Sequence, residues 1–296
     1  RDAQESRGLG DVYKRQLLKF VWKKFLGKFN KGLGIDLGSC NTLVYQQDRG
    51  IVIVESSVVA VNNRTDQILA IGDEARRMLG KTPPHIIATK PLEYGIISDF
   101  EVTEKMLKYF LNKVRSGRFF FSAMPKVIVG VPLDVTAVEK KAVEDVLLSA
   151  GASEVFLVEN IIATAIGARI PIQDATGNMV VSLGGGLTEV AVISLNGIVN
   201  WKVSRVAGLA LDRDIINFAR EEFNLILGEM VAEDIKKKIG SAITLKEHLE
   251  MPMRGRDVLT GLPKEVKVND VEILSLIHIS EPTRLLSISY AVFCLK

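Results

Sequence analysis

Two hydrophobic patterns alternate along the middle of this chain. Short β-branched and apolar runs, typical of strands, occur in GLGIDLG, NTLVYQQ, GIVIVESSVVAV and KVIVGVP. Residues 101–115 and 135–150 instead repeat apolar positions at helical spacing. Strands that alternate with helices in this way predict an α/β fold built of layers.

One part of this pattern occurs twice. GIDLGSCNTLVYQQDRGIV and VVSLGGGLTEVAVISLNGIV each contain a strand, a glycine turn, a second strand and the Gly-Ile-Val start of a third. Internal repeats more often indicate a solenoid. Because two copies are present here, we predict two homologous domains that face each other.

The two glycine turns are candidate phosphate-binding elements. The first is Gly38-Ser39-Cys40-Asn41, preceded by Asp36, and the second is Gly184-Gly185-Gly186-Leu187-Thr188. Closely spaced backbone N–H groups and small polar side chains can hold phosphate oxygens. Glycine lets the backbone approach the anion and supplies positive φ where a tight turn needs it. Phosphate would repel Asp36, so we expect this carboxylate to orient water around Mg²⁺.

Either turn alone is more typical of a plain hairpin than of a phosphate site, but the pair in matching contexts predicts a nucleotide cleft between the domains. Neither turn is followed by the Gly-Lys-Ser or Gly-Lys-Thr of a Walker A loop, and neither opens a helix as a GxGxxG motif does. These two common nucleotide-binding folds are therefore disfavoured.

Charge and cysteine content narrow the partners and the compartment. The formal net charge of +3 is too small to favour nucleic acid as a partner. Cys40 and Cys294 lie far apart and the histidines stand singly, which indicates neither a disulfide framework nor a metal cluster. We therefore expect the protein to lie in a reducing cytosol. No apolar run reaches the roughly 20 residues of a spanning helix and no signal peptide is evident, so membrane contact is expected to be peripheral.

Residues 17–31 predict an amphipathic, cationic helix. Its apolar positions are Leu18, Val21, Trp22, Phe25, Leu26 and Phe29, and lysines stand between them. Such a helix suits the surface of an anionic bilayer, with Trp22, Phe25, Leu26 and Phe29 as the predicted membrane contacts. The alternative is a helix that packs on the first domain.

Both ends of the chain differ from the rest. Residues 1–16 and 275–296 resemble translated sequencing-adapter read-through, and they are left out of the predicted fold. The alternative is an ordinary polar tail at each end.

The first glycine turn carries a family resemblance. Asp36-Leu37-Gly38-Ser39-Cys40-Asn41-Thr42 resembles the first phosphate motif of the actin, sugar-kinase and heat-shock-chaperone superfamily, and its Asn-Thr ending is closest to the MreB family of bacterial actins. Further segments resemble the same family in order: Ile71-Gly72-Asp73-Glu74-Ala75, Gly80-Lys81-Thr82-Pro83, Val129-Gly130-Val131-Pro132, Ala150-Gly151-Ala152-Ser153, residues 178–195, Gly228-Glu229, Ala232-Glu233, Ile235-Lys236 and Thr260-Gly261-Leu262-Pro263. The resemblance covers residues 32–274.

The resemblance implies an actin-like fold with two domains around an ATP cleft. Domain I would span residues 32–168, and domain II would span residues 169–274 and be incomplete. By the same resemblance Asp36 would organise Mg²⁺ through water, and Glu233 with Lys236 would contact the ribose and adenine side. The implied nucleotide-binding residues are Asp36, Gly38, Ser39, Cys40, Asn41, Thr42, Gly184, Gly185, Gly186, Gly208, Glu233 and Lys236.

The family resemblance also implies a cellular role. It indicates self-assembly into filaments at the inner face of the cell membrane, where they organise cell-wall synthesis and shape-determining proteins and maintain rod shape. An apolar loop of the first domain, with Phe119, Phe120 and Phe121, would add a membrane contact, because three consecutive phenylalanines cannot all face one core from a strand. A buried loop is the alternative.

Two carboxylates that the family usually carries are missing here. Asn160 stands where family members have the glutamate that positions the attacking water, and Ser182 stands where they have a second acidic residue near the metal; Leu209-Ala210 replace a further acidic pair. An amide orients water but accepts no proton, so we expect slow hydrolysis. The alternatives are a polymerising scaffold that does not hydrolyse ATP, or a kinase or chaperone of the superfamily, against which the short segment 51–90 and the lack of a substrate domain argue.

Overall fold

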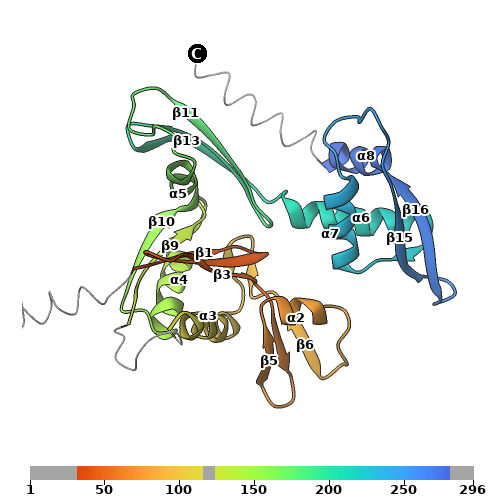
Figure 1. Cartoon of the computed structure of the whole chain (residues 1–296), viewed down its shortest axis with the longest axis horizontal. Coiled ribbons are helices and arrows are strands. Elements are labelled where there is room, and N and C mark those ends of the chain that lie inside the picture. The colour runs from red at the N-terminus through yellow and green to blue at the C-terminus, as the bar shows by residue number, and fades with distance from the viewer. Residues whose placement is uncertain (1–31, 116–123, 281–296) are drawn as a thin grey trace, which may run out of the picture.

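The computed structural model describes residues 32–115 and 124–280, with side chains as far as residue 276. The predicted membrane helix at residues 17–31 and the phenylalanines at positions 119, 120 and 121 lie outside the described residues. Figure 1 shows the described part as several units around a central gap. None of its helices is long and apolar enough to cross a membrane.

A five-stranded sheet with the order β10-β9-β1-β2-β3 forms the first unit. Its strands are β1 (Leu33–Leu37), β2 (Asn41–Gln46), β3 (Gly50–Ser56), β9 (Lys126–Val131) and β10 (Glu154–Glu159). The first three pair antiparallel as a meander, and β9 and β10 extend the sheet in parallel to β1. Helices α3 (Phe100–Arg115) and α4 (Ala137–Ser149) match the two predicted helical segments.

The core of this unit follows from the alternation along its strands. Leu33, Ile35 and Leu37 on β1 are buried, and the residues between them are more exposed, as expected for one face of a strand. They pack with fully buried Phe110 of α3 and Leu147 of α4 in one hydrophobic cluster.

A smaller three-stranded sheet extends from the end of β3. It comprises β4 (Val59–Asn62), β5 (Gln67–Ile71) and β6 (Ile86–Thr89), with helix α2 (Asp73–Met78). This outer unit has a hydrophobic cluster of its own, formed by Val58, Ala60, Ala70 and Ala75. The short strands β7 (Leu92–Glu93) and β8 (Ile96–Ile97) follow and lead into α3.

The predicted duplication is confirmed by the third unit. Strands β11 (Asn178–Leu183), β12 (Thr188–Ser194) and β13 (Gly197–Ser204) form an antiparallel meander with the same connectivity as β1 to β3. Helix α5 (Asn160–Gly167) packs on this second meander through Ile161 and Ala165. Helix α5 therefore packs with the second sheet, whereas the predicted boundary after residue 168 assigns this helix to domain I.

The last unit contains most of the remaining helices. It comprises α6 (Gly208–Phe223), β14 (Leu225–Ile226), α7 (Glu229–Ile239), β15 (Glu250–Asp257), β16 (Pro263–Asn269) and α8 (Asp270–Ser280). Ile215, Leu225, Ile235 and Met253 are buried in its separate hydrophobic cluster. Helix α8 continues past residue 274, where the predicted tail begins.

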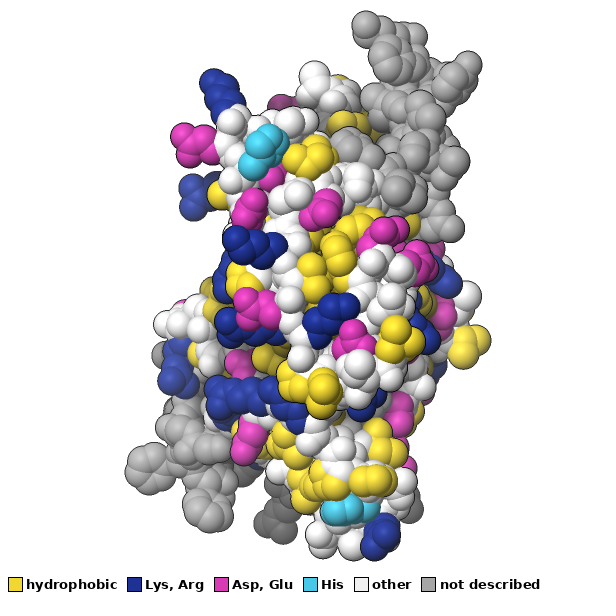
Figure 2. Space-filling model, turned by 90° about the vertical axis from the view of Figure 1, so that its right-hand side faces the viewer, with side chains coloured by type: hydrophobic (Ala, Val, Ile, Leu, Met, Phe, Trp, Pro, Cys, Tyr) yellow, Lys and Arg dark blue, Asp and Glu magenta, His cyan; other side chains and the backbone are white. Residues whose placement is uncertain are grey.

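On the face shown in Figure 2, acidic and basic side chains are interspersed.

The turn between β15 and β16 provides a pH prediction. Hydrogen bonds from the Thr260 N–H, and then the Lys264 ammonium, lower the pKa of Asp257 to about 2. Since the pKa is depressed in the folded chain, the stabilising contribution of this carboxylate is present above its ordinary pKa near 3.8 and is lost as the pH falls through about 2. We expect a midpoint near pH 2 for Asp257 in an NMR titration. A midpoint near pH 4 would contradict the hydrogen-bonded turn.

Candidate functional site

The two glycine turns have the same hydrogen bond. In the turn between β1 and β2, the Gly38 N–H donates to the Asn41 carbonyl at 3.1 Å. In the turn between β11 and β12, the Gly184 N–H donates to the Leu187 carbonyl at 2.8 Å. The predicted duplication therefore extends to the backbone geometry of the turns.

The two turns contact each other directly. A Cβ atom added at Gly185 would lie 2.3 Å from the Cys40 Sγ, and one added at Gly186 would lie 2.5 Å from the Ser39 Oγ. Within the first turn, a Cβ at Gly38 would lie 2.7 Å from the Asn41 carbonyl oxygen. None of these glycines has positive φ. The expectation of left-handed backbone was therefore wrong for these turns, which need glycine because only a residue without Cβ fits the space.

A third turn, which the sequence analysis missed, supports the contact. Tyr94 and Gly95 connect β7 to β8, and the Gly95 N–H donates to the Ser39 Oγ at 2.8 Å. Two arginines that follow β13 in the chain also contact Tyr94. The Arg205 guanidinium lies 5.2 Å from the centre of the Tyr94 ring, and Arg213 donates to the Tyr94 hydroxyl at 3.3 Å. A single Tyr-Gly pair carries no signal that would have identified this turn.

Two carboxylates from different units lie beside the turns. Asp36 is the fourth residue of β1. Part of this residue is exposed to solvent, but desolvation by the surrounding protein raises the pKa of its carboxyl. Glu189 on β12 is buried and accepts a hydrogen bond from the Leu133 N–H at 2.9 Å. Burial raises the pKa of Glu189, the Leu133 hydrogen bond opposes this rise, and the Asp134 and Asp36 charges add to it. Carboxylates that are kept partly buried, despite the free-energy cost of desolvating their charge, are typical of sites that bind a cation or a substrate.

Sequence analysis missed Glu189, although it directly follows the second glycine motif. In the described part of the chain no three His, Cys, Asp or Glu side chains form a metal site by themselves.

Asn160 and Ser182 are placed on different elements. Asn160 is the first residue of α5, and its Oδ1 lies 2.0 Å from where a Cβ at Gly130 of β9 would be. Ser182 on β11 pairs in register with Glu189 on β12. An amide can donate and accept hydrogen bonds, but it does not take a proton from water near neutral pH. Glu189 is therefore directly opposite Ser182 in this pair of strands.

Gly208 and Lys236 belong to a polar contact that supports the second turn. The Gly208 N–H donates to the Gly184 carbonyl at 3.2 Å, so the start of α6 lies against this turn. Lys236 of α7 donates to the Gly208 carbonyl at 2.9 Å and forms an ion pair with Asp212 Oδ1 at 2.7 Å. This Oδ1 has no hydrogen bond of good angle, so its bond to Lys236 is mainly ionic. Burial raises the pKa of Asp212, and the contact with the Lys236 ammonium opposes the rise.

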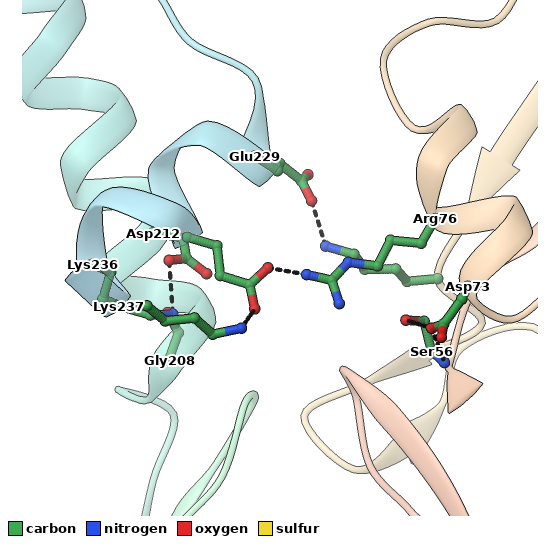
Figure 3. A network of polar contacts seen from close by, with 10 residues as sticks. Ser56, Asp73, Arg76, Gly208, Asp212, Glu229, Lys236 and Lys237 are labelled. Atoms are coloured by element: carbon green, nitrogen blue, oxygen red, sulfur yellow. Dashed lines mark hydrogen bonds and ion pairs between the residues drawn. The ribbon is translucent and has the colours of Figure 1, made fainter. Parts of the chain in front are cut away.

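Glu233 on α7 has two ion-pair partners. It pairs with Lys237 of the same helix, at 2.7 Å, and with Arg76 of α2, which belongs to a different unit. Figure 3 shows these contacts beside a second bridge, in which Lys90 meets Glu229 at 2.5 Å. Burial raises the pKa of Glu233, but the Lys237 and Arg76 contacts outweigh it and leave the pKa lowered. This carboxylate is therefore charged and able to accept hydrogen bonds.

Comparisons with known proteins agree on one family. The family model described as MreB/Mbl protein matches residues 30–288. The chain is 46% identical over 260 residues to the cell shape-determining protein MreB of Escherichia coli strain K12, covering 86% of this chain and 75% of that protein. It is 42% identical over 245 residues to the cell shape-determining protein Mbl of Bacillus subtilis strain 168, covering 83% of this chain and 73% of that protein.

Solved structures give the same result for the fold. The crystal structure of MreB5 of Spiroplasma citri bound to AMPPNP matches with a TM-score of 0.84 and 32% identity, over 90% of this chain and 79% of that one. The same protein bound to ADP matches equally well. The MamK double helical filament matches with a TM-score of 0.72, at 21% identity, over 90% of this chain and 81% of that one.

Proposed function

Because the chain belongs to the MreB/Mbl family and has its actin-like fold, we propose that it binds ATP with Mg²⁺ between its two domains. We propose further that it assembles with copies of itself into filaments. In this proposal the filaments lie at the inner face of the cell membrane and organise cell-wall synthesis. The shape-determining role is the function for which its relatives are named.

One observation carries the nucleotide proposal. Two turns with the same internal hydrogen bond come from facing units and meet at Cys40 and Gly185. Backbone N–H groups gathered in this way are suited to phosphate oxygens. The relative from Spiroplasma citri was solved with AMPPNP and with ADP, which supports the same ligand class for this chain.

The proposed roles follow from the positions of the side chains. The residues at positions 38–41 and 184–186 would hold the phosphates. Mg²⁺, when bound, neutralises phosphate charge. It fits beside Asp36 because desolvation disfavours the charged carboxylate and raises its pKa, and a nearby cation offsets this effect. Glu233 would accept hydrogen bonds from ribose hydroxyls. Lys236 would act indirectly, since it is engaged with Asp212 and Gly208.

Turnover is proposed to be slow. A general base that takes a proton from the attacking water typically contributes about 10²–10⁴-fold in rate. Asn160 cannot supply this function, and Ser182 lacks the charge that would help to hold a metal. ATP binding and release, more than hydrolysis, would then control the conformation of the cleft.

Asp36 provides the test of this proposal. We expect Asp36→Asn to weaken binding of a fluorescent ATP analogue in the presence of Mg²⁺ by about tenfold, which is the effect of ~1.4 kcal/mol, and to remove most of its Mg²⁺ dependence. Because folding raises the pKa of Asp36, its contribution to stability is largest below its ordinary pKa and falls as the pH rises through the raised value. The melting temperature at pH 7 should therefore not decrease.

Glu144→Gln is a matched control for Asp36→Asn, because Glu144 lies on α4 in a local ion pair with Lys141. It should bind the analogue as the wild type does. Wild-type chain that binds no analogue would favour the scaffold that does not use nucleotide.

The membrane part of the proposal rests on Trp22, Phe25, Leu26, Phe29, Phe119, Phe120 and Phe121, and sedimentation with anionic liposomes tests it separately.

A further inference from the structure

Two ion pairs join α7 to the unit that contains α2. Arg76 on α2 meets Glu233 on α7, and Lys90, directly after β6, meets Glu229 at the start of α7. Glu229 and Glu233 are one helical turn apart, so both carboxylates lie on the same side of α7. Figure 3 shows both bridges running from one ribbon to the other. We call these two ion pairs the latch.

The latch joins units that do not share a core. The cluster around α2 contains Val58, Ala60, Ala70 and Ala75, and the cluster around α7 contains Ile215, Leu225, Ile235 and Met253. Moving one unit away from the other would break the ion pairs and leave both clusters intact. Opening of the cleft at this end therefore depends on charge more than on apolar packing.

The two oxygens of Glu233 have different partners. Oε2 is held by Arg76 across the cleft, and Oε1 is held by Lys237, which is one turn further along α7. The Lys237 side chain is 62% exposed, and an exposed pair at this spacing is weak. A ribose hydroxyl could therefore replace Lys237 at Oε1 while Arg76 stays on Oε2.

The latch is also connected to the first glycine turn. The Ser57 hydroxyl donates to the Gly38 carbonyl at 2.6 Å, and its neighbour Ser56 donates to Asp73 Oδ1 through its hydroxyl, also at 2.6 Å. Asp73 is the first residue of α2, which carries Arg76 in its last turn. Two adjacent serines thus join the first glycine turn to the helix that holds the latch.

From these contacts we propose that the latch is a gate for nucleotide exchange, in which Arg76 holds the ribose-side carboxylate Glu233 and thereby slows both the entry and the release of the nucleotide. The proposal rests on the nucleotide binding proposed above. Arg76 acts through Glu233 and the position of α2, and so it is a positioning residue. Loss of the gate changes the exchange rates more than the affinity, because both directions pass through the open state.

Stopped-flow measurements with a fluorescent ATP analogue on the full chain test the gate. Arg76→Gln should raise the association and dissociation rates of the analogue by roughly threefold to tenfold, the range that partly shielded ion pairs supply, with the dissociation constant changed less than either rate. Lys90→Glu places two acidic groups together and should have the same effect. Adding Glu229→Lys to Lys90→Glu should restore the wild-type rates.

Lys141→Gln is the matched control, because it removes ion pairs that lie within α4, away from the cleft. It should leave the rates unchanged. Rates that are unaffected by Arg76→Gln and by Lys90→Glu, in a chain that binds the analogue, would overturn the gate and leave the proposed function standing. A change in affinity with an unaltered dissociation rate would also overturn it, because the latch would then affect only the entry of the nucleotide and not its release.

A second measurement needs no nucleotide. Spin labels at Arg77→Cys and Asp234→Cys, on exposed positions of α2 and α7, would report the separation of the two helices in a background without Cys40 and Cys294. We expect the distance distribution to broaden toward longer distances at high salt, which screens ion pairs, and to do so at low salt in Arg76→Gln. A distribution that responds to neither change would overturn the latch, even if the chain binds no nucleotide.

Discussion

Replacing Asn160 with glutamate is expected to raise the rate of phosphate release from ATP by about 10²-fold. The new carboxylate would stand at the start of α5 beside Gly130, where the Asn160 amide lies now. A carboxylate can take the proton of an attacking water, and this assistance is typically worth about 10²–10⁴-fold. We expect the lower end of this range because Ser182 still lacks a charge. Phosphate release at saturating ATP and Mg²⁺ measures the effect, with analogue affinity recorded in parallel.

Asn160→Gln is the matched control for that change. It has the length of glutamate and the amide of asparagine, so it should not raise the rate. Adding Ser182→Asp to Asn160→Glu should increase turnover further, by restoring a second acidic group near the proposed metal. If the wild-type chain turns ATP over rapidly and Asn160→Ala abolishes this activity, then our assignment of slow hydrolysis to Asn160 is wrong.

Gly186→Ala is expected to weaken analogue binding by about tenfold to a hundredfold. The new Cβ would lie 2.5 Å from the Ser39 Oγ and 3.1 Å from the Tyr94 Cα. The serine hydroxyl can rotate away, but the Tyr94 backbone cannot move without disturbing the turn that bonds to Ser39. Overpacking of this kind costs about 1–3 kcal/mol, and each 1.4 kcal/mol is about a factor of ten. A titration of the wild type and the variant measures the loss.

Gly197→Ala belongs to the same meander and serves as the control, because its Cβ would meet the nearest atom at 3.6 Å, an ordinary contact. It should bind the analogue normally. Both variants should keep the wild-type circular dichroism spectrum, since the change at Gly186 affects the contact between units. Normal affinity in Gly186→Ala would show that the two turns need not approach each other to hold the ligand.

Much of the fold could be predicted because it is locally encoded. The strands of each meander are neighbours in the chain, and the burial of Leu33, Ile35 and Leu37 follows from simple alternation. The glycine turns were recognisable because the same short motif recurs, and their shared hydrogen bond confirms the comparison. A hairpin is specified by contiguous residues, so its geometry can be inferred without knowing what lies opposite.

The surroundings of the turns could not be predicted in the same way. Tyr94, Glu189 and Asp212 look like ordinary loop, strand and helix residues, and each gained a role only when distant segments met. Lys236 was expected near the ribose and adenine, but its ammonium is engaged with Asp212 and the Gly208 carbonyl. Which charges pair depends on the distances between side chains from different units, and spacing along one segment contains no such information.

By itself, therefore, the sequence determined the duplicated meanders and the two turns, because strand alternation and glycine placement act over a few neighbouring residues. The family was indicated separately, by the resemblance of several short motifs to those of known members. The tertiary structure alone decided that Cys40 lies against Gly185 and that Arg76 reaches Glu233 across the cleft. These contacts join residues far apart in the chain, and the residues that make them are held by units with separate hydrophobic clusters.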